Sequence, residues 1–268
     1  MAAESAVLQW HVLGPFEVTA DGCPVDLGGP QLRSVLARLV VVPGRTVSVA
    51  ALAAELWSEG APAHAHRTVR TYLSKVRATL RRAVGVRAEE MLVTRAPGYQ
   101  LRLDPTAVDA VRFERLAASG RQATEAQQPL FAIQRLTAAL DLWCGDAFAE
   151  FARHPTVSAE GVRLDRLRLV AVEARIEAAL TLGLNAQVAS ELEGLVRTHP
   201  TRERLWEQLM TALYRSGRQV EALDAFRTVR TVLIRDHGVE PSPRLAEIHR
   251  QVLHHDVKLT RTAPRVHL

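Results

Sequence analysis

The amino-acid sequence predicts a mainly α-helical protein in two parts. A mixed α+β part is expected over residues 1–104, an all-helical part over residues 105–256, and a tail over residues 257–268. Short runs of alternating apolar and polar residues, typical of strands, occur before residue 104. From residue 109 onward apolar residues recur at helical spacing, with prolines and glycines between the runs. Hydrophobic residues make up 47% of the 268 residues, which is enough to build two cores.

The mixed part begins with a small antiparallel sheet. Residues 7–27 alternate in short runs that are broken by two glycine-containing turns, a pattern that predicts strands joined tightly. Helical spacing then runs from Pro30, a residue tolerated in a first turn, until Pro43-Gly44 ends it. After a short extended piece, Ser48 is placed to cap a second helix that ends near Trp57.

A third helix, expected at residues 66–83, lies in the segment that holds the positive excess of the chain. The formal net charge is +5, and residues 64–102 carry nine Lys or Arg against two Glu, whereas residues 103–268 are nearly balanced. A localised positive field suits a polyanion, because neutralised phosphates release condensed counterions. On charge alone, an ordinary solvated face is an equal alternative.

A helical wheel separates this third helix into two faces. The apolar stripe predicts packing against a core and consists of Val69, Tyr72, Leu73, Val76 and Leu80. The opposite face is polar or small and consists of Arg67, Arg70, Thr71, Ser74, Arg77, Ala78 and Arg81, with Lys75 at its margin. Arginine can pair with guanine or clamp phosphate, and small side chains leave room for close approach. We therefore expect this helix to read DNA.

A hairpin follows the third helix. Strands are expected at residues 91–95 and 99–103, joined at Ala96-Pro97-Gly98, with basic residues at the tip and edge. A sheet, three helices and a basic hairpin form the order of a winged helix-turn-helix domain with an additional N-terminal sheet. In such a domain one helix enters the major groove while the wing contacts the adjacent backbone.

The second part is predicted to be a stack of helices. They are expected at about 109–121, 130–142, 157–182, 185–198, 203–215, 219–236 and 243–254. The residues around Gly183 reappear around Gly217, and this shift of 34 residues resembles tetratricopeptide helix pairs. Such a stack offers a concave surface to a protein or a ligand, but the pattern does not name the partner.

Other functions have little basis in the residues. Acidic residues are scattered over the helices and no Gly-x-x-x-x-Gly-Lys-Ser/Thr loop occurs, so we expect neither an enzyme nor a cofactor. His64 and His66 have no cysteine or acidic residue nearby, so no metal site is expected. Cys23 and Cys144 are expected to be small buried residues of a cytoplasmic protein. No apolar run reaches the length of a membrane span, so we expect no membrane partner.

In this order of elements the chain resembles the Streptomyces antibiotic regulatory protein (SARP) family, as a short AfsR-like member, over about residues 8–256. Residues 67–80 and 94–99 resemble the recognition helix and wing of OmpR/PhoB-type DNA-binding domains. Residues 139–143, 202–210 and 212–219 are similar to the bacterial transcriptional activation domain of that family.

The resemblance implies a sequence-specific transcription activator in the cytoplasm, associated with the nucleoid. It implies binding to direct repeats in double-stranded DNA, recruitment of RNA polymerase holoenzyme, and control of a secondary-metabolite (antibiotic) biosynthetic cluster. Direct repeats would require a head-to-tail pair of copies, which the residues alone do not decide. Two alternatives stay open: a repressor with the same DNA contacts, and an adaptor that binds proteins through the tetratricopeptide-like part.

The resemblance also assigns residues. It implies DNA contacts by Arg67, Thr71, Ser74, Lys75 and Arg77 and phosphate contacts by Trp57 and Arg95. Arg70 and Arg81 are equally consistent with DNA contact and with solvent-facing roles, and Trp57 is equally consistent with a place in the core. The loop 58–65 matches one that meets polymerase subunits, and its candidate contacts are Glu59, Gly60, Ala61, Pro62 and His64.

Overall fold

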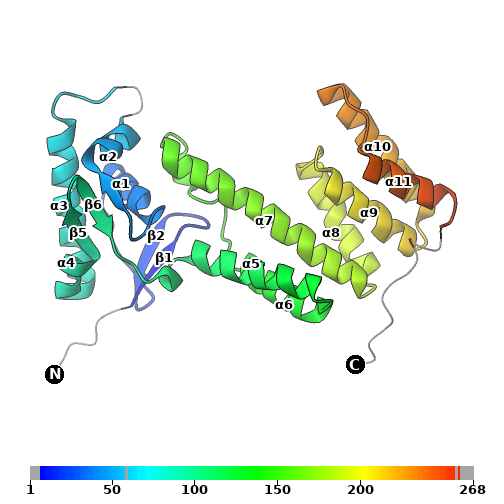
Figure 1. Ribbon diagram of the computed structural model, residues 1–268, viewed down its shortest axis with the longest axis horizontal. Helices are drawn as coiled ribbons and strands as arrows, with labels where there is room; N and C mark the ends of the chain where they lie inside the picture. Colours follow the sequence, from blue (N-terminus) through cyan, green and yellow to red (C-terminus); the bar gives the residue numbers. More distant parts are fainter. Residues whose placement is uncertain (1–6, 58–59, 257–258, 260–268) are drawn as a thin grey trace. The chain divides into compact units, whose positions relative to one another are not determined.

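The computed structural model describes residues 7–57, 60–256 and 259 (Figure 1). The chain packs into two compact units. Unit 1 comprises the residues up to Leu116 together with Ala138–Leu169, and unit 2 comprises Ala117–Thr137 and the residues from Val170 onward. Each unit is therefore built from two separate stretches of chain, and unit 1 includes residues on both sides of position 104. The domain boundary expected at that position stays a prediction.

Unit 1 contains the expected winged helix-turn-helix. Its elements are β1 (Leu8–His11), β2 (Glu17–Ala20), β3 (Cys23–Pro24), α1 (Pro30–Val40), β4 (Thr46–Ser48), α2 (Val49–Leu56), α3 (Ala65–Val84), α4 (Ala88–Met91), β5 (Leu92–Arg95) and β6 (Gly98–Leu101). One antiparallel sheet has the strand order β1-β2-β3, and the second has the order β4-β6-β5. The short helix α4, which lies between α3 and the wing, is not predicted by the sequence pattern.

Local sequence explains where these helices begin. Pro30 occupies the first turn of α1, where its missing N–H leaves no helical hydrogen bond unmade. Ser48 caps α2, because its hydroxyl oxygen accepts a hydrogen bond from the Ala51 N–H at 3.0 Å. Four residues of the predicted apolar stripe of α3 are buried as expected, namely Val69, Leu73, Val76 and Leu80, and the helix packs against α1 and α2. The fifth, Tyr72, is half-buried. Figure 1 shows these helices beside strands β5 and β6.

Buried carboxylates connect distant segments of unit 1. The Asp109 carboxylate accepts hydrogen bonds from the N–H groups of Val12 at 3.0 Å and Leu13 at 3.3 Å, just after β1. The Glu55 carboxylate, at the end of α2, accepts from the N–H groups of Thr156 and Val157. Unpaired N–H groups at these positions would be costly, so the carboxylates fix the N-terminal sheet and α2 to later parts of the same unit.

The two cysteines differ from the prediction. Cys23 and Cys144 are both exposed, with free thiols, so the expectation that they are buried is wrong. Cys23 lies in the two-residue edge strand β3, whose residues are both exposed. Cys144 lies in the loop that follows residue 140, where the preceding helix ends. Neither position is enclosed by a neighbouring element, which residue type alone does not reveal.

The second part of the chain is helical as predicted. Its helices are α5 (Asp109–Glu125), α6 (Pro129–Leu140), α7 (Pro155–Thr181), α8 (Asn185–Thr198), α9 (Glu203–Arg215), α10 (Gln219–His237) and α11 (Pro243–Leu253), with a 3-10 turn at Ala149–Phe151. Within unit 2, α9 packs against α8, α10 and α11. Gly183 and Gly217 both have φ +78°, so the 34-residue repeat places the same left-handed residue after α7 and after α9.

Two features of the described residues concern other classes of protein. None of the described helices combines the length and the hydropathy needed to cross a membrane. Among the described residues, no group of three or more His, Cys, Asp or Glu side chains lies close enough together to hold a metal ion.

Candidate nucleic-acid interface

One face of α3 is exposed and carries most of the side chains expected to contact DNA. Its exposed residues include Arg67, Arg70, Thr71, Ser74 and Lys75. They are three or four positions apart, so they form one stripe about 12 Å long on the helix surface. That length is about the width of a major groove. The opposite stripe is buried in the core, which fixes the direction in which the polar stripe points.

The basic side chains in the first half of this stripe remain available to a ligand. Among the described residues, the ion pairs of α3 are formed by Arg77 and Arg81, not by Arg67, Arg70 or Lys75. A guanidinium without a carboxylate partner keeps its donors for phosphate or for a guanine edge. In the described part of this helix, Arg67, Arg70 and Lys75 therefore form a group of positive side chains without a carboxylate partner.

Arg77 and Arg81 have a different setting, which the sequence does not reveal. Arg77 is half-buried, and its Nη2 donates to the Leu92 carbonyl oxygen at 3.0 Å and to Thr94 Oγ1 at 3.4 Å. Its Nε lies 3.4 Å from Glu89 Oε2, and Arg81 forms an ion pair with the same carboxylate. The two arginines thus connect α3 to α4 and to the first strand of the wing. Glu89 is the residue that sequence reasoning missed, because a helix as short as α4 has no readable periodicity.

The wing is held close to the start of α2 by a glycine. Gly98 pairs with Ser48 in the β4-β6 ladder. A Cβ added at Gly98 would lie 2.6 Å from the Ser48 Cα and closer still to the Val47 carbonyl oxygen, so a larger residue would push the strands apart. Arg95, opposite Gly98 in the hairpin, is exposed at the wing tip. The structure therefore places the predicted phosphate-contacting arginine on the surface.

The remaining predicted contacts surround the start of α3. Trp57 follows the last residue of α2, is half-buried, and donates its backbone N–H to the Ala53 carbonyl at 3.0 Å. His64 is exposed immediately before α3, and its carbonyl accepts the N–H of Arg67. In the loop between the two helices, Gly60 and Ala61 are exposed and Pro62 is half-buried, while Glu59 lies outside the described residues.

Comparison with known proteins agrees with this architecture. Residues 108–253 match the family model described as the bacterial transcriptional activator domain. The chain is 39% identical over 263 residues to the regulatory protein DnrI of Streptomyces peucetius, covering 97% of both chains. It is 39% identical over 257 residues to the regulatory protein AfsR of Streptomyces coelicolor, which covers 96% of this chain and 25% of AfsR.

A solved structure is similar as well. It is Mycobacterium tuberculosis EmbR in complex with a low-affinity phosphopeptide, with a TM-score of 0.90 at 36% sequence identity. The match covers 93% of this chain and 66% of the EmbR chain. The curated EmbR sequence of that organism is described as a transcriptional regulatory protein and is 37% identical over 246 residues, 92% of this chain and 63% of its own length.

The fold, the basic helix and these relatives together define a class of protein: a DNA-binding regulator of transcription and not an enzyme. The chain belongs to the SARP family of regulators, with a bacterial transcriptional activator domain over residues 108–253. The resemblance that the sequence motifs suggest is thereby confirmed.

Proposed function

We propose that this regulator activates transcription by inserting the exposed stripe of α3 into the major groove of directly repeated DNA half-sites. The observation that carries the proposal is the row of exposed, unneutralised basic side chains at Arg67, Arg70 and Lys75. Thr71 and Ser74 lie between them and are short enough to let the helix approach base edges. The hydroxyl of Thr71 donates to the Arg67 carbonyl at 3.2 Å, so its oxygen keeps an acceptor site toward the groove.

The seven predicted positions of α3 then have two different roles. Arg67, Arg70, Thr71, Ser74 and Lys75 contact DNA directly. Arg77 connects α3 to the wing through β5, and Arg81 is paired with Glu89, which withholds it from DNA. Phosphate contacts that fix the orientation come from Arg95 and Trp57 on either side of the groove.

Activation is supported by the description of the matching family, a bacterial transcriptional activator domain. The regulated genes belong, in this proposal, to a secondary-metabolite (antibiotic) biosynthetic cluster, as the resemblance to the SARP family implies. RNA polymerase is contacted through the loop that includes Gly60, Ala61, Pro62 and His64. Two copies bind head to tail, because direct repeats have the same orientation and cannot be matched by a two-fold dimer.

Footprinting on the promoter next to the gene of this protein tests the DNA contacts. We expect protection of two directly repeated half-sites about one helical turn apart, with affinity that falls steeply as salt rises. Changing Arg67, Arg70 and Lys75 together to Ala should abolish protection. Arg153→Ala is the matched control, because Arg153 is also exposed in unit 1 but lies outside the helix. Equal protection by both proteins would refute the assignment of α3.

Reporter transcription decides the sign of regulation. With the same promoter, the wild-type protein should raise transcript levels and the triple α3 variant should not. A fall in transcript levels would instead show that the protein is a repressor that uses the same DNA contacts. A partner protein that binds equally well to the triple variant, with no DNA preference in either protein, would instead support an adaptor.

A further inference from the structure

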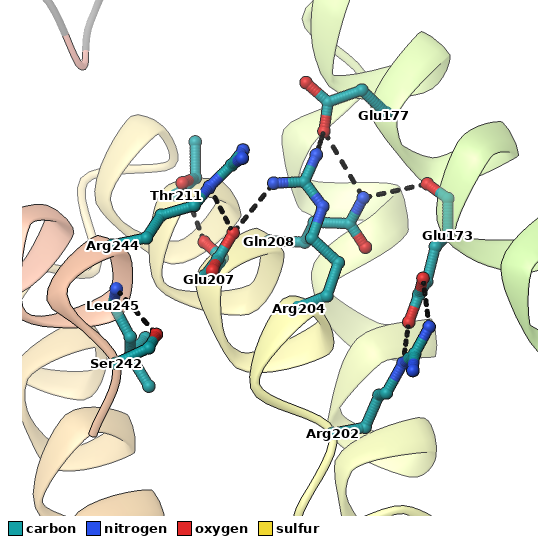
Figure 2. Close-up of polar contacts among 10 residues, drawn as sticks. All are labelled: Glu173, Glu177, Arg202, Arg204, Glu207, Gln208, Thr211, Ser242, Arg244 and Leu245. Atoms are coloured by element: carbon teal, nitrogen blue, oxygen red, sulfur yellow. Dashed lines mark hydrogen bonds and ion pairs between the residues drawn. The ribbon is translucent and has the colours of Figure 1, made fainter. Parts of the chain in front are cut away.

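A polar pocket lies within unit 2, between α7, α9 and α11. Its volume is about 220 Å³, and its described lining includes three arginines and two glutamates. Figure 2 shows two of these arginines, Arg204 and Arg244, and both glutamates, Glu177 and Glu207. This is smaller than the cavities of about 300–1,000 Å³ that hold drug-sized ligands. The size therefore limits an occupant to a small metabolite, and the lining suits one that is charged.

Glu207 organises one wall of this pocket. Only 6% of its side chain is exposed, and its Oε2 accepts from Arg204 Nη1 at 2.7 Å and lies 2.8 Å from Arg244 Nε. Figure 2 shows this carboxylate between the two guanidinium groups, with Arg204 also reaching Glu177 at 2.7 Å. This enclosed carboxylate therefore fixes the positions of both guanidinium groups.

Arg244 keeps donors that these contacts do not use. Arg244 is 67% exposed at the rim and gives its Nε to Glu207, so its two terminal nitrogens remain for a carboxylate or a phosphate. Deeper in the pocket, Arg215 donates to the backbone carbonyls of Leu180 at 3.1 Å and Leu259 at 2.7 Å. Burial lowers the pKa of Arg215.

A buried acceptor in the same lining requires a donor. Gln208 is 2% exposed, and its Nε2 donates to the Glu173 carbonyl at 2.8 Å and to Glu177 Oε2 at 3.3 Å. These two bonds fix the orientation of the amide. Its Oε1 is enclosed and meets no donor in the described chain. Leaving a buried acceptor unpaired is unfavourable, so this oxygen favours a ligand that brings an N–H or O–H group.

We propose that the pocket binds a small organic anion that also carries a hydroxyl or amine. The acid group is held by Arg244 and Arg204, and the hydroxyl or amine donates to Gln208 Oε1. Apart from Leu259, which follows α11 in the chain, every residue in this argument lies on α7, α9 or α11. The site can therefore be tested without DNA, and its failure would leave the assignment of α3 untouched.

Calorimetric titration of the full chain tests the site. The probes are L-malate, L-aspartate and 3-phosphoglycerate, each of which combines an acid group with a donor. Succinate matches L-malate but has no hydroxyl. We expect saturable binding of at least one probe, and succinate should bind about tenfold more weakly than L-malate because it leaves Gln208 Oε1 unpaired.

Two variants and a matched control locate the binding. Arg244→Ala should weaken binding at least about tenfold, since it removes a charged hydrogen bond. Arg250→Ala should not, although Arg250 lies on the same helix with the same 67% exposure, paired with Glu247 outside the pocket. Gln208→Met should reduce malate binding to the succinate level. Because Arg244 is exposed, Arg244→Ala keeps the test valid if Gln208→Met, which changes a buried residue, fails to fold.

Either of two results would overturn this proposal. The first is that none of the three probes binds. The second is that binding is equal in Arg244→Ala and Arg250→Ala, which would assign the anion to another surface.

Discussion

The carboxylate of Glu89 neutralises the C-terminal end of the DNA-reading helix, so removing its charge should strengthen DNA binding. Glu89→Gln keeps the shape of the side chain and removes its ion pairs with Arg77 and Arg81. Arg77 stays attached to the wing through the Leu92 carbonyl, so only Arg81 is released. The variant should leave the wing in place while adding one free guanidinium beside the groove.

The size of the effect follows from the exposure of the pair. Side chains of Arg81 and Glu89 are 61% and 47% exposed, and exposed pairs are worth about 0.2–1 kcal/mol. If Arg81 exchanges this pair for one phosphate contact, affinity should rise by a factor of about 1.4 to 5 at low salt. The logarithmic dependence of affinity on salt should steepen by about 0.9, the value for one additional phosphate.

Fluorescence anisotropy with a labelled promoter duplex, between about 50 and 200 mM salt, measures both quantities. Glu90→Gln is the control, because Glu90 is the exposed neighbour of Glu89 in α4 and changes the net charge equally. We expect a smaller gain and an unchanged salt dependence for the control. The same gain in both variants would attribute the effect to net charge, and a loss of affinity in Glu89→Gln would mean that Glu89 instead supports the interface.

Three other predictions concern the supports of the two units. Glu55→Ala removes a 4%-exposed carboxylate that accepts hydrogen bonds from two N–H groups at the start of α7. Urea denaturation should show that the free energy of unfolding falls by about 3–5 kcal/mol, and a fall of less than about 1 kcal/mol would contradict the account. Gly98→Ala forces a Cβ against the Val47 carbonyl and should weaken DNA binding while far-UV circular dichroism keeps the helical signal; wild-type affinity would show that the wing position is unimportant. Burial and the Arg227 charge lower the pKa of His249, which stacks on Phe226 at 3.9 Å, so the folded state binds fewer protons than the unfolded state and loses stability as pH falls below about 6.5. His249→Phe keeps a stacked ring, and its melting temperature should therefore fall less than that of the wild type between about pH 7.5 and pH 5.5; an equal fall would assign the pH dependence elsewhere.

Most of the helices can be predicted because their signals are local. Pro30 and Ser48 mark helix starts through their own covalent chemistry, and the expected starts of α1 and α2 agree with the structure. The repeat of Gly183 at Gly217 is similarly readable, because a left-handed residue after a helix favours glycine. The buried stripe of α3 follows from helical periodicity alone, so its exposed stripe is predictable too.

The supports of the site are not local, and sequence reasoning missed them. Glu55 contacts residues about one hundred positions away, and nothing in its own segment distinguishes it from an exposed glutamate. The role of Glu89 depends on α4, which is too short to show a period. The exposure of Cys23 and Cys144 likewise depends on which neighbours enclose them. Residue type gives the chemistry of a side chain, while its partners come from tertiary packing.

The assignment of α3 as the base-reading element is tested most directly by selecting bound sequences from a random DNA library. The experiment compares the wild type with Arg67→Ala and Arg70→Ala, using Arg153→Ala as the control. The wild type and the control should select the same directly repeated motif, and each α3 variant should lose its base preference at particular positions, corresponding to about 1–3 kcal/mol per contact. An unchanged motif for both α3 variants would contradict the account.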